Sequence, residues 1–208
     1  PLDERGAGRA GQGDSHHGVL AAVLEARTSG RGQVIDAAML DGVNAMLSFT
    51  RGLHAAGWWL DERESNLFDG GAHMYANYET KDGKAISIAP IEVEFYDQFM
   101  EIMDIDPTEM PARMDRTGWP QWKKKLAAVF KKKTRDQWCA ILEGTDVCFA
   151  PVLTMGEAPD HPHNHARKTF VQHEGVTQPA PAPRFSRTPS AIQGPSPKPG
   201  EHTAEVLS

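Results

Sequence analysis

The fold is decided by residues 29–42, which read SGRGQVIDAAMLDG. Gly30 and Gly32 indicate a tight turn, because glycine adopts backbone conformations that other residues avoid. The β-branched run from Gln33 to Asp36 is suited to a short buried strand. The stretch that follows, Ala37 to Trp59, carries apolar residues at helical spacing. Turn, strand and helix in this order predict an α/β domain.

The sequence before this turn predicts one helix preceded by an irregular leader. Residues 1–17 are rich in glycine, alanine and charge and follow neither the helical nor the strand period, so we expect irregular structure there. Residues 18–68 are assigned to part of a large α/β domain. From Gly18 to Arg27 the apolar residues recur at helical spacing, namely Val19, Leu20, Val23 and Leu24.

The sequence after the second helix predicts a small α+β domain over residues 69–155. Asp82-Gly83 is a strong hairpin turn between two stretches of strand character, Tyr75 to Thr80 and Lys84 to Ala89. Residues 156–208 turn proline-rich and predict an extended tail that returns to the large domain. The remaining expected elements are helices over Glu92–Met103 and Trp119–Lys131, a short helix capped by Thr134 and Gln137 and ended by Gly144, and a strand over Val147–Leu153.

The composition is that of an ordinary globular protein of 208 residues, with 39% hydrophobic and 24% charged residues. The net charge of −6 argues against a general nucleic-acid-binding protein, because such proteins usually carry a basic excess. No apolar run approaches the ~20 residues that cross a bilayer, so we expect a soluble, cytoplasmic protein with no membrane partner. Cys139 and Cys148 are too few for a disulfide framework and are expected to be reduced thiols.

Two carboxylates are candidates for acid–base chemistry, and each also has a structural explanation. Glu92 follows an apolar strand and begins a helix, where a carboxylate stabilises the helix dipole. At the end of a strand that faces a cleft, Glu92 would instead orient a histidine. Asp14, which precedes Ser15, His16 and His17, is either a helix N-cap or an acid–base group at the mouth of a site.

Three further sequence patterns could either bind a ligand or have a purely structural role. Asp69-Gly70-Gly71 would let the backbone approach a ligand closely, and it would serve equally as a turn. The lysines within 123–125 and 131–133 could bind phosphate, although their position opposite an apolar helix face favours a solvated surface. His161, His163 and His165 alternate as metal ligands on a strand would, but Pro162 interrupts the run, and no metal site is predicted.

Several stretches together resemble one superfamily, the family III CoA-transferases with their racemase relatives. Residues 30–42 resemble the helix–turn–strand signature of that superfamily. Further stretches, and the tail, resemble the α-methylacyl-CoA racemases within it. They are Asn66–Ala72 with Tyr75, Tyr78 and Asp82-Gly83, then Ile91-Glu92 with Phe95-Tyr96, then Gly144–Leu153, and finally Pro181–Pro189 and Gly200–Thr203.

The resemblance implies an incomplete large α/β domain and a small α+β domain, in a family whose members form interlocked dimers. It also implies an isomerase that racemises C2 of 2-methyl-branched acyl-CoA thioesters, and hence a place in lipid or fatty acid metabolism. The C2 proton leaves on one face and returns on the other through an enolate, which needs two acid–base groups. Coenzyme A is part of the substrate, and no separate cofactor is implied.

The resemblance also assigns roles to single residues. In the family one base is a histidine supported by a glutamate, to which Glu92 corresponds, and the other is an aspartate, to which Asp14 corresponds. The family's histidine and its CoA-binding arginines belong to a region N-terminal to the matched residues. We therefore expect this chain to form a homodimer or to associate with such a segment. The residues placed at the substrate are Asp69, Gly70, Gly71 and Tyr75.

Two alternative functions remain open. A CoA-transferase of the same superfamily would move CoA between carboxylic acids, with an aspartate as the nucleophile. Such transferases often carry a glycine-rich loop in the small domain, where this chain has only Gly70-Gly71, and this favours the racemase. The other alternative is a catalytically incomplete chain that kept the fold for binding or assembly.

Overall fold

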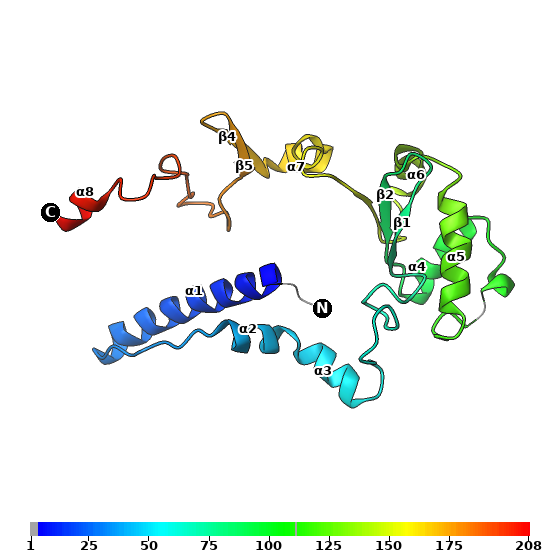
Figure 1. Ribbon diagram of the computed structural model, residues 1–208, viewed down its shortest axis with the longest axis horizontal. Coiled ribbons are helices and arrows are strands. Elements are labelled where there is room, and N and C mark those ends of the chain that lie inside the picture. Colours follow the sequence, from blue (N-terminus) through cyan, green and yellow to red (C-terminus); the bar gives the residue numbers. More distant parts are fainter. Residues whose placement is uncertain (1–3, 111) are drawn as a thin grey trace. The chain divides into compact units, whose positions relative to one another are not determined.

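The computed structural model describes the backbone of residues 4–110 and 112–208, and the side chains of residues 16–110 and 112–208. The chain divides into two compact units, Pro1–Pro151 and Val152–Ser208. The first unit runs from helix α1 through the strands β1 and β2 to helix α6, and the second carries α7, β4, β5 and α8 (Figure 1). Among the described residues, no helix combines the length and the apolar character needed to cross a membrane.

Helix α1 spans Glu4–Ser29, so the expectation of an irregular leader over residues 1–17 is wrong for the part that the structure describes. The predicted helix from Gly18 onward is confirmed, and the helix extends well before it. Extending an existing helix is far easier than starting one, because only nucleation is costly. The alanines and arginines of this segment are good helix formers and tolerate the intervening glycines.

The strand predicted over Gln33 to Asp36 is not formed. A strand needs a hydrogen-bonded neighbour, and residues 31–38 have regular structure of neither kind in the described chain. Val34 is 97% exposed, so the β-branched run is not buried either.

The helix predicted over Ala37 to Trp59 is present as two shorter helices, α2 (Met39–Met46) and α3 (Ser48–Ala55), which meet at Leu47. Helix α3 ends early because Gly57 adopts a positive φ of +74°. The N–H groups of Gly57 and Trp58 then bond to the carbonyls of His54 at 3.0 Å and Leu53 at 2.8 Å. This is the Schellman arrangement, which terminates a helix.

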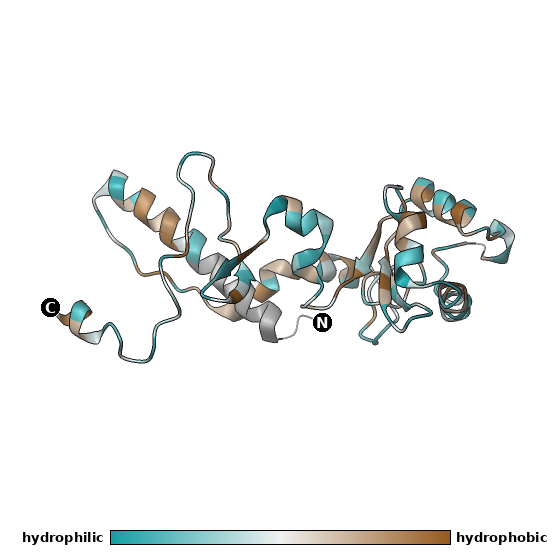
Figure 2. Ribbon diagram, turned by 90° about the horizontal axis from the view of Figure 1, so that it is seen from above, coloured by the Kyte–Doolittle hydropathy of each residue, from teal (hydrophilic) through white to brown (hydrophobic). Residues whose placement is uncertain are grey.

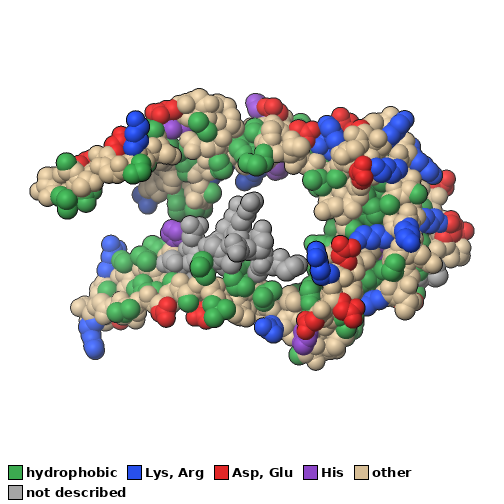
Figure 3. All heavy atoms as spheres, in the orientation of Figure 1, with side chains coloured by type: hydrophobic (Ala, Val, Ile, Leu, Met, Phe, Trp, Pro, Cys, Tyr) green, Lys and Arg blue, Asp and Glu red, His purple; other side chains and the backbone are tan. Residues whose placement is uncertain are grey.

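Helices α1 and α2 both carry exposed apolar residues. Half-buried Gly18, Ala22 and Ala26 form one side of α1, and a Cβ on Gly18 would lie 3.1 Å from Ile35. The larger apolar side chains are exposed instead. Figure 2 colours part of this helix as hydrophobic, and Figure 3 shows hydrophobic side chains on this part of the surface. We name the α1 face by its exposed residues Val19, Leu20, Val23, Leu24, Met39 and Leu40.

The remainder of the first unit contains a three-stranded sheet in the order β1-β2-β3. Its strands are β1 (Ala76–Glu79), β2 (Ala85–Ile88) and β3 (Phe149–Val152). The first two pair antiparallel, with Tyr78 opposite Ile86. The predicted hairpin is confirmed, and Gly83 supplies the positive φ of +75° that its turn requires.

Helices cover this sheet and close the core. They are α4 (Val93–Ile102), α5 (Trp119–Phe130) and α6 (Arg135–Leu142), with a short 3-10 helix, η1, over Pro107–Glu109. The predicted helices and the last strand are confirmed within a few residues at their ends. Phe130 lies at the centre of the core, with ring centroids of Tyr78 at 5.0 Å and Trp138 at 5.2 Å. Such aromatic contacts between distant segments hold the sheet and helices as one body.

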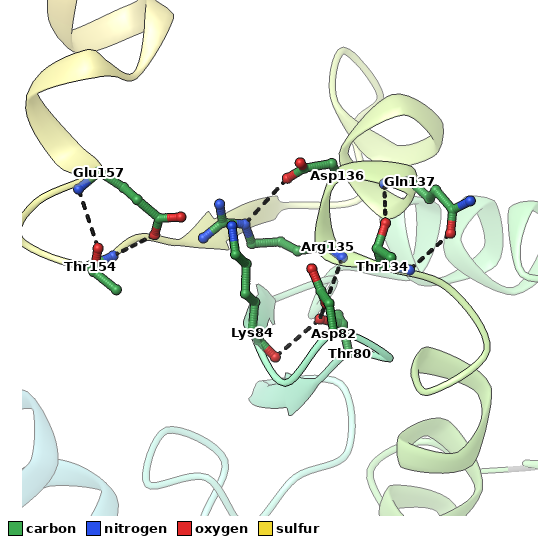
Figure 4. A network of polar contacts seen from close by, with 9 residues as sticks. All are labelled: Thr80, Asp82, Lys84, Thr134, Arg135, Asp136, Gln137, Thr154 and Glu157. Atoms are coloured by element: carbon green, nitrogen blue, oxygen red, sulfur yellow. Dashed lines mark hydrogen bonds and ion pairs between the residues drawn. The ribbon is translucent and has the colours of Figure 1, made fainter.

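The hairpin turn is tied to helix α6 by polar contacts (Figure 4). The Asp82 carboxylate accepts hydrogen bonds from the Thr80 hydroxyl at 2.5 Å and from the Arg135 N–H at 3.2 Å. These hydrogen bonds lower the pKa of Asp82, and the bond from Thr80 has the largest effect. The predicted capping box is confirmed, since Thr134 and Gln137 bond reciprocally at the start of α6.

The second unit is built from short elements. The 3-10 helix η2 (Ala158–Asp160) precedes α7 (Pro162–Arg167), and α8 (Thr203–Leu207) ends the chain. Between them, β4 (Phe170–His173) and β5 (Val176–Pro179) form an antiparallel hairpin. Its turn residues Glu174 and Gly175 both have positive φ, 50° and 79°, which suits the twist of a hairpin.

Candidate functional site

The predicted substrate-binding residue Asp69 lies in a loop that its own carboxylate holds together. One oxygen accepts hydrogen bonds from the N–H groups of Asn66 at 2.9 Å and Gly71 at 3.0 Å. The other accepts one from the Asn66 side chain at 2.9 Å. Burial alone would raise the pKa of Asp69, but these hydrogen bonds outweigh it and lower the pKa. The structure therefore gives Asp69 a loop-organising role, and its contact with substrate stays a prediction.

The buried side chain of Asn66 connects this loop to the backbone of Leu60. It is 1% exposed. Its side chain accepts from the N–H of Leu60 at 2.8 Å and donates to the carbonyl of Leu60 at 2.9 Å. A buried amide that is fully hydrogen-bonded fixes its surroundings, because leaving any of these groups unpaired would be costly. The loop from Leu60 to Gly71 is thus rigid through its own polar contacts.

The paired glycines have different structural reasons. A Cβ on Gly71 would lie 2.7 Å from the backbone of Glu64 and 2.8 Å from the nitrogen of Asn66, so only glycine fits. Gly70 has a φ of +90° and open space beside it, and its carbonyl accepts a hydrogen bond from the Lys123 ammonium. Gly71 therefore serves close packing, while the surface beside Gly70 is accessible to a ligand.

Tyr75, the fourth predicted substrate residue, belongs to a row of aromatic rings. Its ring meets that of Phe68 edge-on at 5.3 Å, and Phe68 lies 6.1 Å from Phe49 of α3. Next to this row is a cavity of about 560 Å³ with a mainly apolar lining. Its lining includes Phe49, Leu53, Trp58, Phe68, Met114 and Trp119. A cavity of this size and character suits an apolar group.

A second, more polar hollow of about 810 Å³ shares Phe68 and Trp59 with the first. Its basic side chains are Arg51, Arg63 and His54. Four carboxylates also line it, and this excess of acid makes it a poor cradle for phosphate. They are Asp61, Glu62, Glu64 and Asp69. Sequence reasoning missed both hollows, because the first combines residues 49–68 with residues 114–119, and the second depends on how residues 47–69 fold back on themselves.

The predicted catalytic Glu92 lies at the start of α4, just beyond the end of β2. Its side chain is exposed and makes no capping hydrogen bond to the helix. The carboxylate is therefore available for another interaction. Glu92 lies near Cys148, whose thiol pKa is raised by burial and by the Glu92 and Asp146 carboxylates. Its assignment as the glutamate that supports a catalytic histidine stays a prediction.

The second predicted catalytic carboxylate, Asp14, lies outside the residues whose side chains the structure describes. Its backbone belongs to α1 rather than to a turn at a helix start, so the N-cap explanation does not hold. Its assignment as an acid–base group stays a prediction. The described residues that follow it, His16 and His17, are exposed.

A buried histidine that sequence reasoning did not single out lies beneath Glu92's helix. His73 is fully buried, and its Nε2 lies 2.9 Å from the hydroxyl of Tyr96 in α4. The Tyr78 hydroxyl donates to the carbonyl of His73 at 2.6 Å. Burial lowers the pKa of His73 to about 4. Burial is also the main reason that the pKa of Tyr96 is raised to about 12. Both side chains are therefore neutral near pH 7.

The remaining sequence candidates take ordinary structural places. Lys131 pairs with Glu79 at 2.5 Å, and Lys125 pairs with Glu109. His163 and His165 lie in helix α7, where residues two apart face different directions. Over residues 16–110 and 112–208, no group of three or more potential metal ligands gathers. Cys139 and Cys148 are free thiols.

A model of the family described as CoA-transferase family III matches residues 15–203. A mouse (Mus musculus) protein named alpha-methylacyl-CoA racemase is 42% identical over 192 residues, covering 91% of this chain and 50% of the mouse protein. The human (Homo sapiens) protein of that name is 39% identical over 193 residues, with the same coverage. The chain thus spans about half the length of these curated relatives.

Solved structures show the same fold. A CAIB/BAIF family protein from Brucella suis superposes with a TM-score of 0.65 at 22% identity, covering 91% of this chain and 51% of that one. Rv3272 from Mycobacterium tuberculosis superposes with a TM-score of 0.67 at 16% identity, covering 90% of this chain and 49% of that one. At these identities the likeness concerns the fold alone.

Proposed function

The chain belongs to CoA-transferase family III, and from that premise we propose that it takes part in racemising C2 of 2-methyl-branched acyl-CoA thioesters. The observation that carries the proposal is the 42% identity over 91% of the chain to a protein named alpha-methylacyl-CoA racemase. The accessible carboxylate of Glu92 at the end of β2 supports it, because it is free to engage an acid–base partner.

In this proposal the C2–H bond of the thioester breaks and its proton passes to a base on one face. The electron pair is held as an enolate, whose oxygen needs hydrogen-bond donors. A proton from an acid on the other face then forms the new C2–H bond. Glu92 supports the base on one side, Asp14 is the group on the other, and no cofactor besides the CoA of the substrate takes part.

The substrate would lie along the loop and the cavity described above. Gly70 and Tyr75 contact it, with Asp69 and Gly71 shaping the loop that carries them. The apolar cavity beside Phe68 would take the branched acyl chain, since most of its lining is aromatic or aliphatic. Such a substrate would place the protein in lipid and fatty acid metabolism.

We further propose that the α1 face is covered in the functional protein, by a second copy or by a segment corresponding to the other half of its relatives. Exposed apolar patches of this kind mark association sites in globular proteins. The free thiols Cys139 and Cys148 suit a reducing compartment such as the cytoplasm.

Deuterium exchange tests the function directly. The protein is incubated with a 2-methylacyl-CoA in deuterium oxide, and label at C2 is followed by mass spectrometry. We expect incorporation that Glu92→Gln lowers roughly 100-fold or more, the range of general acid–base effects. Glu94→Gln is the matched control, because Glu94 is also an exposed carboxylate in the first turn of α4 and would act only on the helix dipole.

The outcomes separate the candidate functions. Equal loss in both variants, or no loss in Glu92→Gln, would contradict the role of Glu92. Formation of a new CoA thioester on addition of a free carboxylic acid, without C2 exchange, would favour the transferase. Acyl-CoA binding by folded protein with neither reaction would mean that the chain is a binding or assembly module.

A further inference from the structure

Glu92 stands on a short turn whose two ends are fixed by backbone hydrogen bonds. Before it, the N–H of Ala89 bonds to the carbonyl of Cys148 at 2.9 Å, and the N–H of Ile91 bonds to the carbonyl of Ala89 at 2.8 Å. After it, the N–H of Tyr96 bonds to the carbonyl of Glu92 at 2.9 Å. The peptide between Ile91 and Glu92 joins these two anchored parts and sets the direction in which the Cα–Cβ bond of Glu92 leaves the backbone.

Arg113 binds this peptide from outside the turn. Its Nη1 donates to the carbonyl of Ile91, and its guanidinium lies 6.0 Å from the centroid of the Tyr96 ring. The backbone of Arg113 is itself fixed, since its carbonyl accepts from the indole N–H of Trp119 at 2.8 Å. A charged donor on a carbonyl is stronger than a neutral one, and a half-buried guanidinium can hold a carbonyl and a ring together.

The ring under Arg113 is fixed in turn by buried groups. The Tyr96 hydroxyl lies 2.9 Å from Nε2 of His73, which is 0% exposed, and Tyr96 itself is 5% exposed. The His73 carbonyl accepts from the Tyr78 hydroxyl at 2.6 Å. The guanidinium therefore lies between an immobile ring and the peptide that carries Glu92.

We propose that Arg113 is a positioning residue for Glu92, holding the Ile91–Glu92 peptide so that the Glu92 side chain leaves the backbone in one direction at the end of β2. This role deepens the proposed racemase function and rests on it for its catalytic consequence. It acts on the reacting centre only through Glu92, so its loss should slow the chemical step without weakening substrate binding.

The test compares Arg113→Gln, Arg113→Lys and Lys133→Gln. Lys133 is the matched control, because its ammonium lies 5.3 Å from the Trp138 ring of the same unit, much as the Arg113 guanidinium lies 6.0 Å from the Tyr96 ring. In the deuterium-exchange assay we expect Arg113→Gln to lower kcat roughly 10- to 100-fold with KM unchanged, as a displaced catalytic group does. Arg113→Lys, which keeps a charged donor, should lose less, and Lys133→Gln should match the wild type.

A second readout does not depend on catalysis. The amide resonances of Ile91 and Glu92, measured by NMR with ¹⁵N labelling, should move in Arg113→Gln and stay in place in Lys133→Gln. If the wild type exchanges no C2 proton, the proposed function fails, and these resonances alone decide the role of Arg113.

Each result then has one meaning. A folded Arg113→Gln with wild-type kcat, with the loss confined to KM, or with unmoved Ile91 and Glu92 resonances overturns the proposal. If Arg113→Gln does not fold, Arg113→Met, which keeps an apolar stem but has no donor, replaces it in both measurements, and wild-type kcat together with unmoved resonances overturns the proposal. A fall in kcat at constant KM, accompanied by moved resonances, supports it.

Discussion

At Gly71 the space that a side chain would need is filled by backbone. The nearest atoms belong to Glu64 and Asn66, and backbone atoms cannot rotate away as a side chain can. The same loop is cross-linked by Asp69 and Asn66, so a displacement at Gly71 would disturb several hydrogen bonds together. Single residues of this loop therefore act as a unit, and the predicted substrate contacts depend on it.

We predict that Gly71→Ala destabilises the protein by about 1 to 3 kcal/mol, the usual cost of overpacking a filled site. Gly52→Ala is the control, because Gly52 lies in helix α3 with nothing within 4 Å of its Cβ position. There alanine should stabilise by up to about 1 kcal/mol. Urea denaturation measures both variants, and a Gly71→Ala variant as stable as the wild type would contradict the packing argument.

How far single site residues can be predicted from sequence depends on where their partners lie. Glu92 could be placed at a strand end because the strand and helix around it carry strong local patterns. The role of Asp69 in its loop could not be predicted, because it depends on hydrogen bonds between groups that only the folded loop brings together. His73 had no sequence signal at all, because its burial is decided by Tyr96 and Trp122 from other segments.

At the scale of elements, the buried bond between His73 and Tyr96 links the segment before β1 to helix α4. Both groups are inside the core, where a charge on His73 would be strongly disfavoured. The folded state therefore excludes the proton that the unfolded chain accepts at an ordinary histidine pKa. The attachment of α4 thus depends on pH.

We predict that the free energy of unfolding falls by about 3 kcal/mol as pH drops from near 6.5 toward 4. The pKa of His73 is lowered to about 4 in the folded state from an ordinary value of 6.5, so its contribution is complete above the unfolded pKa and is lost below it. Urea denaturation in buffers across this range measures the effect.

The matched variant is His73→Gln, whose amide can still bond to Tyr96 but does not titrate. It should remove most of the pH dependence in this window. The lowered pKa of Asp69 contributes at lower pH, because its stabilisation is lost only below the ordinary value of 3.8. An unchanged pH dependence in His73→Gln would contradict the prediction.

Elements with local signals were predicted and those that need distant partners were not. The hairpin at Asp82-Gly83, helix α5 and the Thr134 capping box follow from neighbouring residues, and all are present. The strand expected at Gln33 to Asp36 required a pairing partner that lies outside any local pattern. The second hairpin, β4 with β5, lacked a clear alternation and was missed.

At the scale of the whole molecule, the α1 face departs from an ordinary globular surface. Leu20 is 63% exposed and Leu24 is 64% exposed, although both are apolar and lie side by side on one helix. The half-buried small residues Ala22 and Ala26 occupy a different side of the helix. The apolar side chains are thus turned away from the packing within this unit.

We predict that the protein associates through this face and that Leu24→Glu weakens the association at least tenfold, since burying an unpaired carboxylate costs several kcal/mol. Light scattering over a concentration series measures the assembly. Glu25→Gln is the control, because Glu25 neighbours Leu24 but is not part of the α1 face. A wild-type protein that stays monomeric at every concentration would contradict the prediction.

The hairpin of β4 and β5 also has a practical use. Its register is set by its own turn at Glu174-Gly175, where the exposed backbone reverses within two residues. A spectroscopic label or a short epitope inserted there would perturb neither the Glu92 turn nor the Asn66–Asp69 loop, which belong to the other unit. Paired with a second label in the small sheet, it would make the distance between the two units measurable with and without an acyl-CoA.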